Sequence, residues 1–434
     1  MRFSKYNYLA LSKQYGGLLY NTRTKFFISL TRGLFDQLTE LSLHKDNNIT
    51  IESLGLTDDL TNTLIKGKVF VGENEDDDFF YLKKFLRYNQ AFTKEELSIV
   101  LAPTLACNFQ CPYCYENNLP SNIIKENTID SIISFIKNKG HKSIDLCWHG
   151  GEPLLAFKQI CTFLNKAKEN NIKIKSHGMI TNGFLLDEDK CKILGQYNLN
   201  KIQITIDGDK KWHNKSRVHK SGQPTYDTII NNIENVFKYM PNCHVLIRVN
   251  IHSENQNSFP QLYHTLKDKW EGKNYSLRIE FANNVNNSCK VACIAETHKI
   301  DYARSLYEKY GIDVEAIAQP QIGGCAASCI NTLIIGPMGE IYKCWVDVGK
   351  EDRVIGDIFG NHTNNNILSS YLVGSDMFSD PKCKNCTFMP LCDGGCIVRR
   401  YNQKHYNIPY NPCPINEKDF LSWMELQYIK ITSK

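Results

Sequence analysis

Apolar and polar residues follow two patterns along the chain, one typical of strands and one typical of helices. Between residues 97 and 282, short apolar and β-branched runs alternate with stretches in which apolar residues recur every three or four positions. This alternation predicts an α/β fold whose six strand–helix units form a parallel sheet, either open or curled into a partial (β/α)6 barrel of the TIM type. The expected strands are residues 98–106, 144–148, 172–181, 201–206, 244–251 and 277–281.

Residues 1–95 follow a different pattern and are expected to form a separate module. Aromatic and β-branched runs predict a three-stranded meander at residues 6–11, 18–20 and 26–30. Thr31 and Thr57 are placed to cap two following helices, the second of which would stop at Gly67. Strands followed by helices favour a small winged-helix-like α+β unit, with an extension that has no binding role as the alternative. The acidic run at residues 73–78 is expected to be a solvated linker loop.

The last part of the chain lacks regular periodicity. From about Gly324 to Cys413 it is rich in Gly, Pro and Asn and contains eight cysteines, so it needs something other than a hydrophobic core to hold it together. These changes divide the chain into an N-terminal module at 1–95, a barrel at 96–315 and a cysteine-rich domain at 316–434.

Composition narrows the class of protein. The 434 residues are 42% hydrophobic and 22% charged, which excludes a disordered or collagen-like chain, and a formal charge of +5 gives only weak support for nucleic acid or a membrane surface as partner. The chain starts without an apolar signal segment, and no stretch approaches the ~18 unbroken apolar residues of a membrane span. We therefore expect a cytoplasmic protein with neither partner, in which grouped thiols among the 17 cysteines stay reduced and act as metal ligands.

Three cysteines follow the first expected strand of the barrel, at the edge where parallel sheets carry their chemistry. Cys107, Cys111 and Cys114 lie within eight residues. Three thiols can hold a [4Fe-4S] cluster and leave one iron open to a small molecule, whereas a structural zinc site normally closes with four ligands. The spacing therefore favours an iron–sulfur cluster, and zinc bound by these cysteines and a nearby histidine is the alternative.

The second expected strand ends in a turn suited to binding a ligand. Gly150 and Gly151 let the backbone approach a small molecule, and the carboxylate of Glu152 could hold an ammonium group. The cysteine triplet, with Tyr113 before its last member and Gly-Gly-Glu-Pro further along, resembles the radical S-adenosylmethionine (SAM) enzymes. The resemblance continues through Thr181-Asn182-Gly183, Thr205-Ile206-Asp207-Gly208, His213, Arg217 and Arg248-Val249-Asn250.

This resemblance implies that the chain binds SAM beside the cluster and forms a 5'-deoxyadenosyl radical that abstracts hydrogen from a substrate. Glu152 would bind the methionyl ammonium group of SAM. Thr205 and Arg217 would lie near its carboxylate or ribose, and Asn182 would lie beside the pocket. The implied cofactor-binding residues are Tyr113, Gly150, Gly151, Glu152, Asn182, Thr205 and Arg217.

The eight cysteines of the tail suit two closed four-cysteine sites, with two zinc ribbons as the alternative. Their spacing resembles the SPASM extension of radical SAM enzymes, which carries two auxiliary [4Fe-4S] clusters and would bring the total to three. By that resemblance the first auxiliary cluster is bound by Cys325, Cys329, Cys344 and Cys396, and the second by Cys383, Cys386, Cys392 and Cys413. Among the other cysteines, Cys147 could face the cavity, and Cys289 and Cys293 are assigned no chemistry.

By cysteine spacing, the tail is most similar to anaerobic sulfatase maturases and to maturases of ribosomally made peptides. Sulfatase maturases place an Asp directly after the third cysteine of the first auxiliary cluster. Here Trp345 follows Cys344, and Asp347, two residues further on, is the candidate catalytic base. The N-terminal module resembles the winged-helix element with which peptide maturases capture a leader peptide as an added strand, here on the edge of residues 26–30.

We therefore expect a peptide maturase that abstracts hydrogen from a precursor peptide and forms a thioether or carbon–carbon cross-link. A low-potential donor such as flavodoxin or ferredoxin would supply its electrons. Three alternatives stay open: formylglycine formation as in sulfatase maturation, a peptide epimerase, and a non-enzymatic zinc-binding scaffold.

Overall fold

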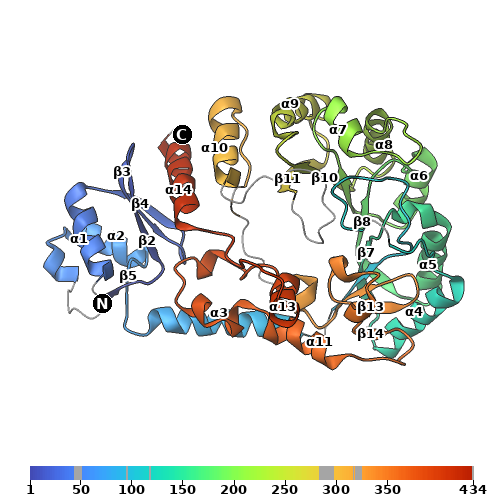
Figure 1. The fold of residues 1–434 in the computed structure, drawn as a ribbon, viewed down its shortest axis with the longest axis horizontal. Helices are drawn as coiled ribbons and strands as arrows, with labels where there is room; N and C mark the ends of the chain where they lie inside the picture. Colours follow the sequence, from blue (N-terminus) through green and yellow to red (C-terminus); the bar gives the residue numbers. More distant parts are fainter. Residues whose placement is uncertain are drawn as a thin grey trace.

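The computed structural model describes residues 1–43, 51–93, 96–116, 119–282, 298–315, 317 and 325–432. Figure 1 shows a small N-terminal module, a curved parallel sheet covered by helices, and a cysteine-rich region beside both. The expected α/β class is confirmed. Cys289 and Cys293 lie outside the described residues.

Nine strands form the main sheet, in the order β11-β10-β9-β8-β7-β6-β12-β13-β14. Neighbours among its six barrel strands pair in parallel and follow sequence order, which confirms the expected partial barrel. These strands are β6 (Leu97–Leu101), β7 (Ser143–Trp148), β8 (Lys173–Thr181), β9 (Lys201–Thr205), β10 (His244–Ile251) and β11 (Tyr275–Phe281). The cysteine-rich region extends the sheet with β12 (Thr332–Ile335), β13 (Glu340–Tyr342) and β14 (Gly356–Asp357), an addition that the sequence did not predict.

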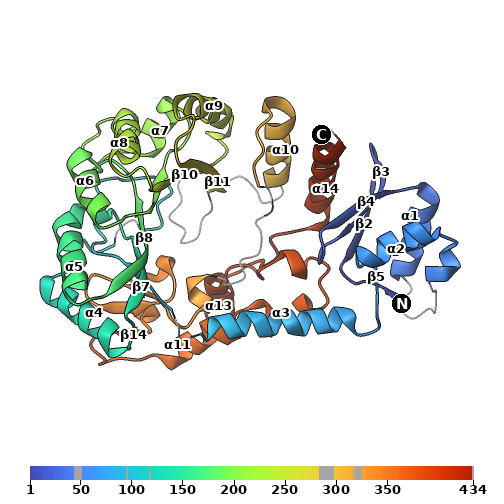
Figure 2. The same cartoon turned by 180° about the vertical axis from the view of Figure 1, so that it is seen from behind.

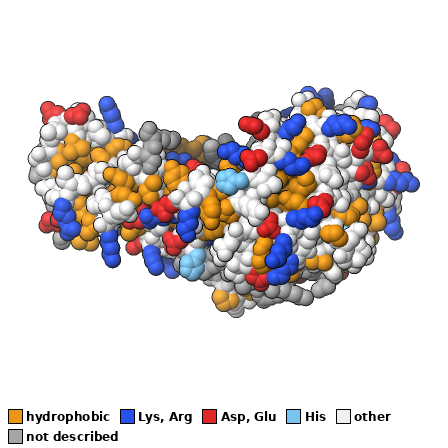
Figure 3. Space-filling view, turned by 90° about the horizontal axis from the view of Figure 1, so that it is seen from above, with side chains coloured by type: hydrophobic (Ala, Val, Ile, Leu, Met, Phe, Trp, Pro, Cys, Tyr) orange, Lys and Arg blue, Asp and Glu red, His pale blue; other side chains and the backbone are white. Residues whose placement is uncertain are grey.

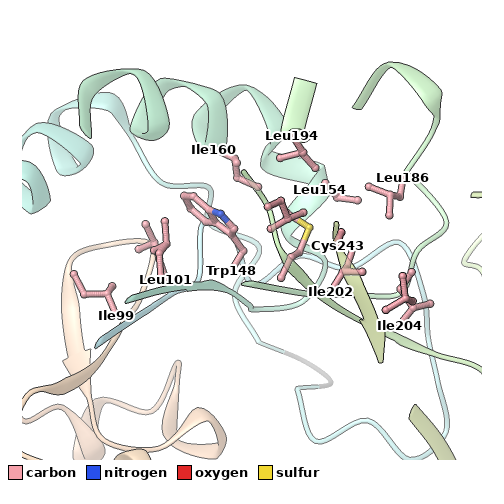
Figure 4. Close-up of a cluster of buried hydrophobic side chains, with 14 of the residues drawn as sticks. Ile99, Leu101, Trp148, Leu154, Ile160, Leu186, Leu194, Ile202, Ile204 and Cys243 are labelled. Atoms are coloured by element: carbon pink, nitrogen blue, oxygen red, sulfur yellow. The ribbon is translucent and has the colours of Figure 1, made fainter. Parts of the chain in front are cut away.

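Amphipathic helices cover the outer face of the barrel strands (Figure 1). They are α4 (Glu126–Asn138), α5 (Phe157–Glu169), α6 (Glu188–Gln196), α7 (Lys210–Ser216), α8 (Tyr226–Tyr239) and α9 (Phe259–Lys269), and α10 (Lys299–Tyr310) follows beyond β11. Their apolar faces and the strands share one core, in which Trp148 of β7 lies with Ile160 of α5 and Leu154 (Figure 4). The core fixes the strand ends that carry the chemistry.

His177 on β8 adds a pH-sensitive group to this core. Its Nε2 accepts a hydrogen bond from Trp148 Nε1 at 2.8 Å, and its Nδ1 lies 3.0 Å from the carbonyl oxygen of Tyr197, so the neutral ring satisfies both partners. Burial lowers the pKa of His177 to about 4.

Because the unfolded chain binds this proton near pH 6.5 and the folded chain does not, stability should fall as pH decreases from 6.5 toward 4, by ~2 kcal/mol at pH 5. Urea unfolding at pH 7 and pH 5 should show that His177→Gln loses less stability than the wild type on acidification. The exposed-residue control His264→Gln should behave as the wild type does. Equal acid losses in all three proteins would contradict the assignment.

The N-terminal module contains the predicted meander and helices. Its sheet has the order β2-β3-β4. These strands and the two following helices are β2 (Asn7–Ser12), β3 (Gly16–Asn21), β4 (Phe26–Leu30), α1 (Arg32–Leu43) and α2 (Asp58–Lys66). Thr57 caps α2 by accepting a hydrogen bond from the Leu60 amide, and α2 ends at Gly67, as predicted. A second, two-stranded sheet pairs β1 (Arg2–Phe3) with β5 (Phe70–Val71).

The expectation of a solvated loop at residues 73–78 is wrong. Residues 75–78 form the first turn of a long helix, α3 (Glu75–Ala91), where carboxylates are stabilised by the helix dipole. Asp76 is fully buried and accepts hydrogen bonds from Ser4 Oγ and the Lys5 amide, both at 2.9 Å. Figures 1 and 2 show α3 running from the N-terminal module along the cysteine-rich region.

The cysteine-rich region also contributes helices. They are α11 (Asn365–Ser369), α12 (Pro381–Lys384), α13 (Ile397–Tyr406) and α14 (Glu417–Thr432). Helix α14 lies against the N-terminal sheet, where Tyr20 of β3 makes edge-to-face contacts with Phe420 and Trp423. The two ends of the chain therefore pack together.

None of the described helices is long and apolar enough to cross a membrane. On the face shown in Figure 3, acidic and basic side chains are interspersed among apolar patches.

Candidate active site

The cysteine triplet lies in the loop that follows β6, and this loop is held from two sides. The amide of Gln110 donates to the carbonyl oxygen of Val218 at 2.8 Å, and the amide of Lys220 donates to that of Asn108 at 2.9 Å. Asn182, at the end of β8, donates from its Nδ2 to Asn108 Oδ1 at 2.7 Å. The sequence-predicted Asn182 therefore fixes the cysteine loop against the next strand ends.

The three thiols lie in a buried environment. Burial, the largest cause in each case, raises the pKa of Cys107 to about 12 and of Cys114 to about 11, and the neighbouring Cys111 raises both further. Such thiols become thiolates only when a positive centre binds them, which is what an iron cluster provides.

The turn at Gly150 and Gly151 packs against the main chain of residues 104–106, which precede Cys107. A Cβ on Gly150, whose φ is +115°, would lie 2.3 Å from the Thr104 carbonyl oxygen, and a Cβ on Gly151 would lie 2.3 Å from that of Ala106. Hydrogen bonds from the Gly151 amide to Thr104 O (3.2 Å) and from the Glu152 amide to Ala106 O (2.8 Å) hold the two segments together. Only glycine allows this close approach.

Glu152 is a fully buried carboxylate at the centre of the strand ends. Its Oε1 accepts hydrogen bonds from Thr181 Oγ1 at 2.7 Å and the Leu154 amide at 3.0 Å, and its Oε2 accepts one from the Asn182 amide at 2.8 Å. Burial raises the pKa of the Glu152 carboxyl group, although the hydrogen bonds and Arg217 oppose the shift. A buried carboxylate held by neutral donors suits a ligand ammonium group as its counter-charge.

A second buried network holds Tyr113 and Arg217. The Tyr113 hydroxyl donates to Asp207 Oδ2, and Arg217 Nη1 donates to the Tyr113 oxygen at 3.3 Å. Asp207 is fully buried and also accepts from the Asn250 amide at 2.9 Å. The Arg217 Nε is buried without a hydrogen-bond partner among the described residues, which leaves a donor for a ligand.

Thr205, the last residue of β9, is buried two positions before Asp207. The sequence pattern includes Asp207, but sequence reasoning did not assign it a site role. Its position directly after a barrel strand was the signal that could have identified it.

A further cluster at this rim was missed. The Tyr115 hydroxyl lies 3.1 Å from His149 Nε2, Glu116 Oε1 lies 3.6 Å from the same nitrogen, and the His149 ring lies over Trp345 with centroids 4.5 Å apart. Burial raises the pKa of Glu116 to about 8 and lowers that of His149 to about 3. These contacts join the triplet loop to the residue after Cys344.

In the tail, cysteines that are far apart in the sequence lie close enough to affect one another's pKa. Besides burial, which is the largest cause, the Cys325 thiol raises the pKa of both Cys344 and Cys396, and Cys396 also raises that of Cys344. Burial lowers the pKa of the neighbouring Lys343, and Cys329 and Cys325 both raise it. We call the group Cys325, Cys329, Cys344 and Cys396 site I.

The other four tail cysteines are linked by a similar series of pairwise effects. In addition to burial, Cys413 raises the pKa of Cys386, Cys386 raises that of Cys392, and Cys392 raises that of Cys383. We call Cys383, Cys386, Cys392 and Cys413 site II. In the part of the chain that the structure describes, no three His, Cys, Asp or Glu side chains converge closely enough to hold a single metal ion.

Asp347 and Cys147 are two further residues that the sequence analysis singled out. Asp347 is buried and its Oδ2 accepts a hydrogen bond from the Tyr371 hydroxyl at 2.9 Å, whereas its Oδ1 has no partner among the described residues. Cys147 lines a cavity of about 300 Å³ on the inner face of the sheet, together with Val100, Gly178 and other strand residues.

Comparisons with known proteins agree with this geometry. Residues 101–266 match the model of the Radical SAM superfamily. With the parallel barrel and the cysteine triplet at its rim, this match makes the chain a radical SAM enzyme, with the iron–sulfur and SAM-binding chemistry of that class.

Its relatives include anaerobic sulfatase-maturating enzymes and a radical SAM cyclopropyl synthase. The cysteine-type anaerobic sulfatase-maturating enzyme of Clostridium perfringens is 23% identical over 377 residues, which cover 78% of this chain and 98% of that protein. The radical SAM cyclopropyl synthase TigE of Paramaledivibacter caminithermalis is 24% identical over 388 residues, 79% of this chain and 76% of TigE.

Two solved structures share the fold. The enzyme anSMEcpe with bound AdoMet superposes with a TM-score of 0.61 at 19% identity, over 78% of this chain and 98% of its own. Streptococcus suis SuiB bound to S-adenosylmethionine superposes with a TM-score of 0.52 at 16% identity, over 92% of this chain and 96% of its own.

Proposed function

We propose that this enzyme is a maturase of a ribosomally made precursor peptide, in which it forms a thioether or carbon–carbon cross-link. The observation that carries the proposal is a groove of about 540 Å³ beside β4 in the N-terminal module. Its apolar lining includes Ile28 and Leu30 of β4, Leu34 of α1 and Leu60 of α2. A groove of this composition suits the apolar side chains of a leader peptide.

The edge strand beside the groove supports the same partner. In the described part of the chain β4 pairs only with β3, so its other side presents unpaired backbone groups. An extended peptide can add to such an edge, with main-chain hydrogen bonds giving affinity and alternate side chains entering the groove. The leader would therefore bind far from the reacting residues. The cavity of the barrel would then not need to recognise a particular sequence around the residues that react.

Peptide chemistry is also consistent with the relatives. anSMEcpe was solved with AdoMet and the Cp18Cys peptide bound. The SuiB superposition leaves about 35 residues of this chain unmatched, fewer than the N-terminal module contains, so part of that module shares its fold with SuiB.

The proposed cofactors are SAM and three [4Fe-4S] clusters, held by the triplet, site I and site II. When bound, they supply a radical that takes hydrogen from a substrate C–H bond and a route for the remaining electron. The chain's own groups would bind and orient: Glu152 the methionyl ammonium, and Arg217 with Thr205 the carboxylate or ribose. Asp347 is the proposed base, through its unpaired Oδ1, and flavodoxin or ferredoxin the proposed electron donor.

Formylglycine formation is the second candidate, because several of the sequence relatives are sulfatase-maturating enzymes. The residue after Cys344 argues against it, since Trp345 lies over the His149 ring where those enzymes would carry a carboxylate.

Anaerobic incubation of the reduced enzyme with a short precursor encoded beside its gene tests the function. Mass spectrometry should show loss of two hydrogens localised between two residues. Substituting Asp for Ile28 or Leu60 should weaken precursor binding about 10- to 100-fold, because each loses a buried apolar contact worth ~1.5–3 kcal/mol. SAM cleavage without peptide should stay at the wild-type rate.

The matched control is Leu43→Asp, which places the same charge on an exposed residue that does not line the groove. An unchanged precursor alongside oxidation of a Cys or Ser in a sulfatase peptide would favour the second candidate. Deuterium uptake from heavy water without hydrogen loss would indicate an epimerase. Equal precursor binding by all three Asp variants and the wild type would refute the groove as the leader site.

A further inference from the structure

A buried lysine lies against site I. Lys343 precedes Cys344 directly and has no solvent exposure. Its ammonium group donates to the carbonyl oxygens of Cys329 and Thr332. Lys343 is therefore held at the loop that carries site I.

The surroundings of Lys343 lack an ordinary counter-ion. Its side chain is fully buried, and its ammonium group lies against the main chain of the site I residue Cys329. No carboxylate forms an ion pair with Lys343 among the described residues, and its hydrogen-bond acceptors are neutral carbonyls. A buried ammonium group is costly unless a negative group compensates it. The compensating charge available here belongs to the site I cysteines.

Cations lie near both cysteine sites. At site I, Arg87 of α3 donates to Ser328 Oγ at 2.7 Å, and its Nη1 is buried without a partner among the described residues. At site II, Arg400 Nη2 lies 3.6 Å from Cys383 Sγ, but the same guanidinium pairs with Asp380 at 2.9 Å. Site II also has a lysine, because Lys83 of α3 donates from its Nζ to the carbonyl oxygen of Cys392 at 3.1 Å. Each site therefore has a lysine that donates to the main chain of one of its cysteines.

We propose that Lys343 makes the reduction potential of the cluster at site I more positive than it would be without this cation. The proposal rests on the proposed function, because it requires a [4Fe-4S] cluster at site I. Such a cluster with four thiolates is negatively charged and becomes more so on reduction, so a nearby buried cation favours the reduced form. Lys343 acts through the cluster and touches no substrate.

Potentiometric titration monitored by electron paramagnetic resonance tests this in the full chain. Replacing the triplet cysteines by Ala leaves signals from the tail alone, and Cys383→Ala in that background identifies the site II signal. Adding Lys343→Met or Lys343→Gln should move the site I midpoint to more negative potential by at least 59 mV, a tenfold change in a one-electron equilibrium. The site II midpoint should not move. The control Lys404→Met removes an exposed charge from α13 and should change neither midpoint.

Iron analysis separates the possible failures. If the triplet-free chain binds iron for fewer than two clusters, the cofactor set of the proposed function fails, and this proposal fails with it. If both clusters are present and both neutral variants keep the wild-type midpoints, the Lys343 proposal alone is overturned. Lys343→Gln keeps a hydrogen-bond donor in case Lys343→Met loses the cluster. Loss of site I iron from both variants would overturn the proposal in favour of a purely structural lysine.

Discussion

Replacing Glu152 by Gln should weaken SAM binding by about 30-fold to several thousand-fold and slow SAM cleavage equally at subsaturating SAM. The carboxylate is fully buried and held by the Thr181 hydroxyl and two backbone amides. Removing one partner of a buried charge pair costs about 2–5 kcal/mol, and each 1.4 kcal/mol is tenfold in affinity. Equilibrium binding of SAM and chromatographic measurement of 5'-deoxyadenosine would give both quantities.

Iron content should stay at the wild-type level in Glu152→Gln, because Glu152 is not a proposed ligand of the cluster. The matched control is Glu169→Gln, which makes the same change on the exposed end of α5. Near-normal SAM affinity in Glu152→Gln would show that the ammonium group binds elsewhere.

Gly151→Ala should reduce SAM cleavage by about 100-fold or more. The new Cβ would lie 2.3 Å from the Ala106 carbonyl oxygen and 2.5 Å from that of Leu105, so the turn and the cysteine loop must move apart. Cys107 is the next residue in that loop, and a displacement of about 1 Å at a reacting centre can cost 10²-fold in rate. Iron content and SAM cleavage should therefore fall together.

Gly72→Ala is the control for this substitution, because a Cβ at Gly72 would meet no atom within 4 Å. Its SAM cleavage should equal that of the wild type. Full activity in Gly151→Ala would mean that the two segments can separate without disturbing the cluster, and the tight turn would then have no role in binding.

The barrel was predictable because its signal is local. Each barrel strand is a short β-branched run followed by an amphipathic helix, and the six expected strands match β6 to β11 within a few residues, except that the first ends earlier. β6 stops at Leu101, since the residues after it turn to meet Gly150 and Gly151. Sequence periodicity does not encode that turn, because its cause lies in a neighbouring strand.

The missed elements depend on distant partners. Asp76 is buried because Ser4 and Lys5, some 70 residues away in sequence, supply its hydrogen bonds. Without that knowledge an acidic run is properly interpreted as solvated. Helix α14 likewise gains its packing from Tyr20 at the other end of the chain.

The residues of the candidate site likewise include some that the sequence predicts and some that depend on contacts formed only in the fold. Residue types with a fixed spacing, such as the cysteine triplet and Glu152, could be selected from sequence. The position of Asp207 after a barrel strand marks it as a candidate, but its contacts with Tyr113 and Asn250 are visible only in the structure. The role of Lys343 could not be predicted, because it depends on burial against the loop at Cys329.

If the leader binds the β4 groove as proposed, helix α3 sets a minimum length for the precursor. Its 17 residues separate the N-terminal module from the barrel by about 26 Å of helix. An extended chain advances about 3.3 Å per residue, so a peptide gripped in the β4 groove needs at least about eight residues before it reaches the opposite end. Precursors whose reactive residue lies closer to the leader than this would be bound and yet left unmodified.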